Sequence, residues 1–203
     1  MYLPTLILAA TAAMATQVPL EAPGPQHRET LPEAVQSVKR LVKEIGTGTM
    51  ASVFPETAGA NAGYPYALME SHAPCHPDGA LTFISFPISL MTRNIRADPH
   101  NKAAYTLQTP LKQGVSAYGQ PRVSFTGNLT FLAPDAAERK RLEECFVEYH
   151  PDAKWWVPGD PDGAHSSLWS RLDITDIYYI GGFGNTGWIG HIPLELYRAA
   201  LNE

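Results

Sequence analysis

The sequence predicts one α+β domain in which an antiparallel β-sheet is flanked by a few helices. Its 203 residues can bury one sizeable core, and a hydrophobic content of 44% excludes global disorder. About six segments with strand character are interrupted by segments with helical periodicity, as in α+β folds built on an antiparallel barrel. The spacing of the strands is also compatible with an open sheet.

The charge, the cysteine content and two absent motifs exclude several classes of function. The net charge is −5 and no long basic block occurs, so nucleic-acid binding is not expected as the main role. Two cysteines are too few for a cysteine-rich scaffold or a four-cysteine zinc site. The sequence contains neither G-x-S-x-G, typical of α/β-hydrolases, nor H-E-x-x-H, typical of zinc proteases.

Residues 30–45 carry the strongest helix signals in the chain. Thr30 and Glu33 form a capping-box pattern, and Pro32 lies in the first turn. An apolar stripe then follows one face until Gly46 ends the helix. Three more helices are predicted, at residues 89–97, 135–149 and 193–201.

Residues 122–132 form the clearest strand. Apolar and polar side chains alternate along this segment, which places Asn128 on the polar face. Weaker patterns of the same kind predict five more strands, at residues 48–54, 66–71, 80–86, 103–109 and 167–180.

The N-terminus has the pattern of a secretory signal peptide. The apolar run at residues 3–15 is about 13 residues long, too short to span a bilayer, and it ends in an A-x-A cleavage pattern. No basic residue precedes it, so an apolar helix without a targeting role is the alternative. We expect a signal peptide at residues 1–15, a flexible lead-in at 16–29 and the folded domain at 30–203. The mature protein is then secreted, or lies in the endomembrane or vacuolar lumen, with no membrane span.

Secretion would give a meaning to two further features of the sequence. Asn128-Leu129-Thr130 is the only N-x-[ST] sequence, so Asn128 is the candidate glycosylation site. Cys75 and Cys145 are a candidate disulfide pair in an oxidising compartment. The alternative for Cys145 is a buried small hydrophobe, because it lies on the apolar face of a predicted helix.

Two segments of the chain resemble known families. Residues 89–99 are similar to the helix-to-strand segment of flavin-binding split barrels of the pyridoxamine-5'-phosphate-oxidase type, and their core at residues 92–99, T-R-N-I-x-x-D-P, is especially similar to the HugZ-like haem branch. Residues 172–177, L-x-I-T-D-I, resemble the CREG family of secreted glycoproteins, which shares that barrel. The G-G-F-G motif at residues 181–184, into which this second segment runs, again resembles the HugZ-like branch. The likeness extends over residues 30–201.

The resemblance implies an antiparallel split β-barrel of the FMN-binding type with flanking helices. It also implies a homodimer, because members of this superfamily usually pair and the flavin-binding members hold FMN at the dimer interface. The cofactor-binding residues that it implies lie on the third strand and the short helix, and they are Ser85, Thr92, Arg93 and Asn94.

The groups that hold the phosphate of FMN are largely missing from the sequence. A phosphate needs basic side chains or several N–H and hydroxyl donors. Where oxidases of this fold carry a basic pair, this chain has Leu90 and Met91, and HugZ-like proteins often have His in place of Met91. The second strand has no basic residue, and Glu70 would repel an anion if it faced the site. We therefore expect no cofactor, with FMN or haem as the alternatives.

Most of these residues also have a structural interpretation. Met91 would pack in the core, Arg93 would make a salt bridge or contact carbonyl groups, and Asn94 would satisfy backbone groups at the helix end. Residues 181–184 would form a bend at the end of a barrel strand, since glycine permits such geometry. The alternative is that these glycines line a cofactor pocket with Trp188.

His72, Cys75 and His76 place three potential metal ligands close together in the sequence. A zinc or copper site would need a fourth ligand, and a disulfide would compete for Cys75. We therefore expect a solvated turn here and no metal site.

Together these patterns predict a secreted, CREG-like glycoprotein. Its flavin site has degenerated, and it binds a small ligand or a protein partner at the dimer cleft. The alternative is a flavin- or haem-dependent oxidoreductase that uses the same cleft. An enzyme that works in that cleft without a cofactor is a third hypothesis, so the patterns leave open whether the protein is an enzyme.

Overall fold

The computed structural model describes residues 27–160, 163 and 165–201, so the expected signal peptide and most of the expected lead-in lie outside the described residues. The helices are α1 (Leu31–Glu44), α2 (Leu90–Ala97), α3 (Ala136–Tyr149) and α4 (Leu194–Ala200), with the short 3-10 helices η1 (Glu56–Asn61), η2 (Ala117–Gly119) and η3 (Pro151–Trp155). The strands are β1 (Thr47–Val53), β2 (Pro65–Ser71), β3 (Leu81–Ser85), β4 (Lys102–Gln108), β5 (Arg122–Phe131), β6 (Leu168–Ile180) and β7 (Ile189–His191). In this part of the chain, no helix has the length and apolar character needed to cross a membrane.

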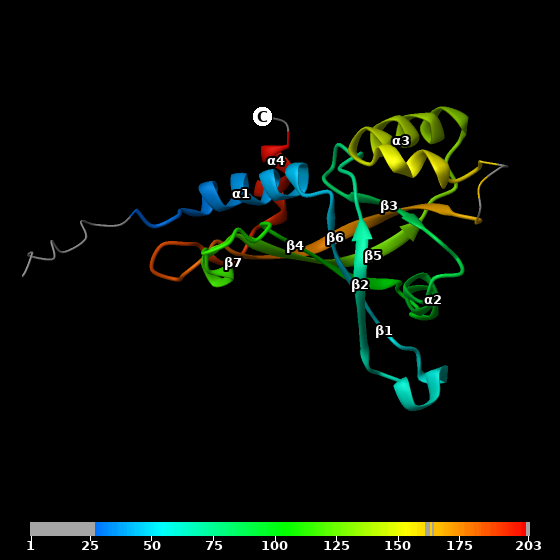
Figure 1. Ribbon diagram of the computed structural model, residues 1–203, viewed down its shortest axis with the longest axis horizontal. Helices are drawn as coiled ribbons and strands as arrows, with labels where there is room; N and C mark the ends of the chain where they lie inside the picture. Colours follow the sequence, from blue (N-terminus) through cyan, green and yellow to red (C-terminus); the bar gives the residue numbers. More distant parts are fainter. Residues whose placement is uncertain (1–26, 161–162, 164, 202–203) are drawn as a thin grey trace, which may run out of the picture.

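The strands of the described residues form one seven-stranded antiparallel sheet. Its order is β2-β1-β4-β5-β6-β3, and β7 pairs with β6. The sheet curls, with β1 and β2 running across the direction of β4, β5 and β6 (Figure 1). This curl brings the two edge strands, β2 and β3, into contact. We call the place where residues 69–71 lie against residues 83–86 the seam. The architecture confirms the predicted α+β split barrel.

The main core lies between one face of the sheet and helices α1 and α4, which pack against each other (Figure 1). Val38 and Leu41 of α1 and Tyr197 of α4 are buried in it. The predicted capping box forms at the start of α1, where the backbone N–H of Thr30 donates to the carboxylate of Glu33 at 2.8 Å. Val38 and Leu41 belong to the apolar stripe of α1, so this stripe is the side of the helix that faces the sheet.

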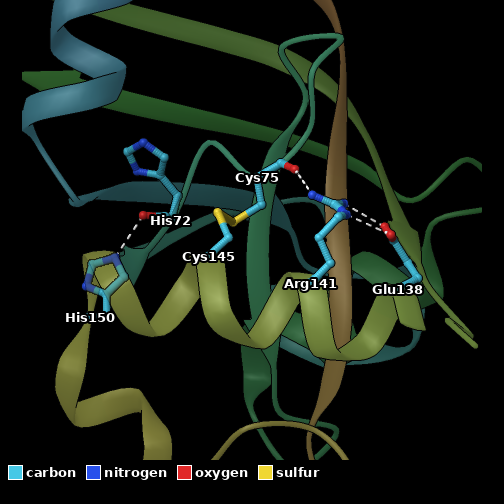
Figure 2. The surroundings of a disulfide bond; sticks show 6 residues. All are labelled: His72, Cys75, Glu138, Arg141, Cys145 and His150. Carbon is cyan, nitrogen blue, oxygen red and sulfur yellow. Dashed lines mark hydrogen bonds and ion pairs between the residues drawn. A yellow bond between two sulfur atoms is a disulfide. The ribbon is translucent and has the colours of Figure 1, made fainter. Parts of the chain in front are cut away.

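A smaller cluster of buried side chains lies between α3 and the sheet. The rings of Phe146 on α3 and Trp169 on β6 meet edge to face, with 5.7 Å between their centroids. A disulfide joins Cys75, in the loop between β2 and β3, to Cys145 of α3, and Arg141 donates to the carbonyl oxygen of Cys75 (Figure 2). This loop is thus fixed to α3 beside the seam.

The G-G-F-G motif forms the bend between β6 and β7, as the structural interpretation of its glycines predicts. Glu29 holds this bend in place, since its carboxylate accepts hydrogen bonds from the hydroxyl of Tyr179 and the backbone N–H of Trp188, each at 2.9 Å. A Cβ at Gly181 would lie 1.9 Å from the same carboxylate, so a side chain at this position would displace the carboxylate of Glu29. Gly181 also borders an open groove of about 560 Å³ at the start of α1.

Candidate functional site

Glu70 lies where the two edges of the sheet meet. It is the penultimate residue of β2 and borders two separate cavities at the seam. The smaller cavity lies toward α2, and its walls include Ser85, Met91 and Thr92. Its volume of about 10 Å³ leaves room for about one water molecule.

The second cavity is wider, with a volume of about 190 Å³, and it extends from the seam toward α3 and η3. Most of its walls are apolar or aromatic. Besides Glu70, the residues that line it are Met69, Ser71, Ile84, Phe86, Phe146 and Trp156. Glu70 is therefore the only residue with a charged side chain among the described residues of this lining.

The carboxylate of Glu70 has no partner in the described part of the chain. The backbone carbonyl of Glu70 accepts a hydrogen bond from the hydroxyl of Tyr105 at 2.9 Å, but no donor or cation there reaches the carboxylate. Burial raises the pKa of this carboxyl to about 7, because removal from water disfavours the charged form. A carboxyl that changes its charge near neutral pH in a cavity is a candidate for ligand or proton binding.

Two of the predicted cofactor-binding residues, Ser85 and Thr92, lie in the wall of the smaller cavity. Both are buried, and both hydroxyls already have a partner inside the protein. The hydroxyl of Ser85 shares a hydrogen bond with that of Ser170 at 2.7 Å, and the hydroxyl of Thr92 accepts one from Ser89 at 2.9 Å. These contacts stabilise β3 against β6 and the first turn of α2.

The other two predicted residues, Arg93 and Asn94, do not line either cavity at Glu70. Arg93 is exposed, and its side chain makes no ion pair or hydrogen bond within the described residues. Asn94 is 3% exposed, and its side-chain nitrogen has no hydrogen-bond partner among those residues. The expected salt bridge of Arg93 is thus not observed there, and the side-chain nitrogen of Asn94 does not satisfy a backbone group.

The potential metal ligands of residues 72–76 have other roles. The Nε2–H of the buried His72 donates to the carbonyl oxygen of Val42 at 3.1 Å, and Nδ1 lies 3.0 Å from the hydroxyl of Tyr105. Burial lowers the pKa of His72 to about 4, so the ring is neutral at neutral pH. Cys75 forms the disulfide with Cys145. No group of three His, Cys, Asp or Glu side chains within the described residues is placed to hold a metal ion.

Comparison with known proteins identifies the family. The β-barrel model of the CREG family matches residues 29–199, which include the seam, α2 and the bend at 181–184. The chain belongs to the CREG family. Curated protein sequences give no match to it.

Solved structures share the split-barrel fold of this CREG-family chain. A haem-binding protein from Mycobacterium smegmatis is 19% identical with a TM-score of 0.63, over 85% of this chain and 61% of that one. ChuZ from Campylobacter jejuni is 12% identical with a TM-score of 0.58, over 79% and 62%. An FAD-binding protein from Mesorhizobium loti is 19% identical with a TM-score of 0.50, over 71% and 91%. The chain therefore spans about three fifths of the first two proteins.

The residues at the seam of this CREG-family chain do not fit the phosphate of FMN. Met91 is 3% exposed and belongs to the main core, as its structural interpretation predicts, and Leu90 beside it offers no donor. Ser85 and Thr92 offer hydroxyls but no charge, and Glu70 brings a carboxylate where a phosphate needs cations. The larger cavity, at about 190 Å³, also lies below the roughly 300–1,000 Å³ of common ligand pockets.

Proposed function

We propose that this CREG-family chain is a cofactor-free binding protein that takes a small ligand or a protein partner at the seam of each chain in a homodimer. The unpaired carboxylate of Glu70 carries this proposal. A partly buried carboxyl without a partner reduces the stability of a fold, so its presence in a cavity favours a binding role. The same carboxylate repels the anionic phosphate of a flavin.

The exposed apolar side chains of the β1–β2 hairpin support the homodimer. This hairpin projects away from the body of the molecule and ends in η1 (Figure 1). Large hydrophobic side chains are exposed along it, namely Val53, Tyr64, Leu68 and Met69. Exposed apolar surface is often covered in protein–protein contacts, and a second copy of this chain would cover part of this hairpin.

Secretion and glycosylation belong to the same proposal. Asn128 is exposed on β5, where a glycan would not disturb the core. The disulfide between Cys75 and Cys145 suits an oxidising compartment. Mass spectrometry of the protein from its native host should find a chain that begins near Thr16 and carries a glycan on Asn128. A native chain that retains residues 1–15 would contradict secretion.

The absence of a cofactor is tested with a visible absorption spectrum of the protein purified from its native host, followed by titration with FMN and haemin. The expected result is a colourless protein with no saturable binding of either compound at micromolar concentration. The haem-binding protein from Mycobacterium smegmatis serves as the positive control for haemin.

The same titration separates the alternatives. A flavin band, or saturable uptake of micromolar FMN, would replace the proposal with a flavin-dependent oxidoreductase. A Soret band would instead support a haem-dependent protein. In either case the cofactor would occupy space beyond the cavities of one chain, because the larger of the two measures only about 190 Å³.

A further inference from the structure

We propose that the wider cavity at the seam binds a small organic cation, in which an ammonium group carries methyl groups or other small apolar substituents. This inference rests on the proposed function, because it assigns a class of ligand to the same site. The cavity of about 190 Å³ opens between β2, β3 and the region of α3 and η3. Its volume suits a ligand smaller than those of common pockets, which measure roughly 300–1,000 Å³.

Glu70 supplies the negative charge that this ligand requires. Glu70 is one of the residues that line the cavity, and its carboxylate has neither a hydrogen-bond donor nor a cation within the described residues. A partly buried carboxylate without a partner loses hydration and gains nothing in return. An ammonium group beside it would supply the missing positive charge, which a neutral ligand does not carry.

Aromatic side chains also line this cavity. Phe86 and Trp156 are half-buried and Phe146 is buried. The faces of aromatic rings attract cations, most strongly where water is excluded, and an ammonium group with apolar substituents is also stabilised by contact with apolar walls. Met69, which is 66% exposed in the single chain, also lines the cavity, so the second copy of the proposed homodimer would border the cavity on this side.

The positively charged side chains nearest in sequence to the cavity walls do not neutralise Glu70. The ammonium group of Lys154 lies over the ring of Trp155, 4.7 Å from its centroid, and does not line the cavity. Arg141 of α3 pairs with Glu138, and Arg93 is exposed on α2. Neither of them lines the cavity. Because no cationic side chain of the described residues neutralises Glu70, a ligand would have to supply the positive charge.

Three other ionisable groups lie close to this part of β2. The hydroxyl of Tyr105 donates to the backbone carbonyl of Glu70, and burial raises the pKa of this phenol far above neutral pH. His72 behind it has a pKa of about 4 and is neutral between pH 5 and pH 8. His150 contacts the carbonyl oxygen of His72 at 2.8 Å (Figure 2). A variant at Glu70 separates the effect of its carboxylate from that of His150.

Choline and its neutral carbon isostere, 3,3-dimethylbutan-1-ol, test the proposal. The two probes have nearly the same shape, and the charge of choline does not change with pH. We would titrate the protein from its native host with each probe by isothermal calorimetry at pH 5 and pH 8. Choline is expected to bind at least tenfold more tightly than the isostere at pH 8. It should also bind at least tenfold more tightly at pH 8 than at pH 5, since Glu70 has a pKa of about 7.

The variant Glu70→Gln keeps the shape of the side chain and removes its charge. It is expected to weaken choline binding at least tenfold and to remove the dependence on pH. Glu56→Gln is the matched control, because Glu56 is exposed in η1 at the tip of the same hairpin. The control variant should bind choline like the unmodified protein.

Several outcomes would overturn this inference. One is that the protein binds choline and its isostere with equal affinity. Another is that Glu70→Gln still binds choline as tightly as the unmodified protein. A third is that choline does not bind because a second copy of the chain fills the cavity. A protein that binds neither choline nor FMN would disprove the inference and leave the proposed function intact. Uptake of FMN would contradict the proposed function itself, so the two failures are distinguishable.

Discussion

At the scale of single residues, two ionisable side chains near the end of β2 have pKa values that are shifted in opposite directions. Burial raises the pKa of Glu70 to about 7 and lowers that of His72 to about 4. Both shifts favour the neutral form, as expected where water is excluded. The Nε2–H of His72 donates to the carbonyl oxygen of Val42 and Nδ1 lies 3.0 Å from the hydroxyl of Tyr105, whereas the carboxylate of Glu70 has no partner in the described residues. His72 therefore has a structural role, and Glu70 is available for binding.

The first prediction concerns the stability of Glu70→Gln. The native carboxyl has a pKa of about 7 and an unfolded one about 4.5, so the native state binds more protons between these values. Stability therefore falls as pH rises from about 4.5 to 7. Urea unfolding should find Glu70→Gln about 1–2 kcal/mol more stable than the unmodified protein at pH 8, after a discount for partial exposure. The difference should largely vanish at pH 4.5, and equal stability at both pH values would contradict a buried, unpaired carboxyl.

The second prediction concerns His72, for which stability changes with pH in the opposite direction. Its pKa is about 4 in the native state and 6.5 in the solvated, unfolded chain, so the unfolded state binds more protons between these values. Stability should fall as pH drops from 6.5 to 4, by about 2–3 kcal/mol from this residue. His72→Gln should flatten that part of the curve, and His100→Gln, at an exposed position, should not. Identical slopes in the two variants would show that His72 is not buried as a neutral ring.

Sequence patterns identified some of these residues and could not place others. They predicted that Met91 lies in the core and that Glu70 would repel an anion if it faced the site. They did not predict which way Glu70 faces. The reason is physical, because β2 lacks an alternation of buried and exposed residues from which a facing direction could be inferred. Asn94 was expected to satisfy backbone groups, yet its side-chain nitrogen is buried without a partner in the described chain. Such a contact depends on how α2 packs, which no local pattern specifies.

At the scale of elements, the predicted helices and the six longer strands agree with the structure to within two residues at each end. Local signals such as caps and alternation were sufficient for them. β7 (Ile189–His191) was missed because three residues are too few for alternation, and Gly190 has a φ of +153° within it. This strand exists because Glu29, far away in the sequence, fixes the bend that precedes it.

The third prediction follows from this role of Glu29. Glu29→Ala leaves the hydroxyl of Tyr179 and the N–H of Trp188 without their shared acceptor. The free energy of unfolding should fall by about 2–4 kcal/mol, since hydrogen bonds to a charged group are worth about 1.5–3 kcal/mol each. Hydrogen exchange at the amide of Trp188 should become faster. Glu44→Ala, at an exposed position in α1, should change neither quantity, and an unaffected bend in Glu29→Ala would refute this role.

At the scale of the whole molecule, the curl of the sheet creates the site. β2 and β3 are the two ends of the sheet, and residues from them meet those of α2 and of the more distant α3 because the sheet edges approach each other. Spacing alone left an open sheet as an alternative, and the resemblance to split barrels was needed to expect the curl. The same curl leaves the β1–β2 hairpin projecting with apolar side chains exposed (Figure 1).

The fourth prediction tests the proposed homodimer. Leu68 is 55% exposed on β2, and Leu68→Glu would bury a charge if a second copy covered the hairpin. Light scattering should find two chains for the unmodified protein at micromolar concentration. The dimer should weaken at least tenfold in the variant. Gln113→Glu, exposed in the loop between β4 and β5, is the control for added charge. A monomeric unmodified protein would contradict the homodimer.

The most direct test of a binding site centred on Glu70 is the titration of this carboxyl by NMR, with carbon-13 in the side chains of the glutamates. The resonance would be assigned from its loss in Glu70→Gln. A midpoint near pH 7 is expected, since burial raises the pKa of the carboxyl to about 7. Choline should shift the midpoint to lower pH, because a bound cation favours the carboxylate. A midpoint near pH 4.5 that choline does not change would mean that Glu70 is solvated or paired, and would contradict a binding site at the seam.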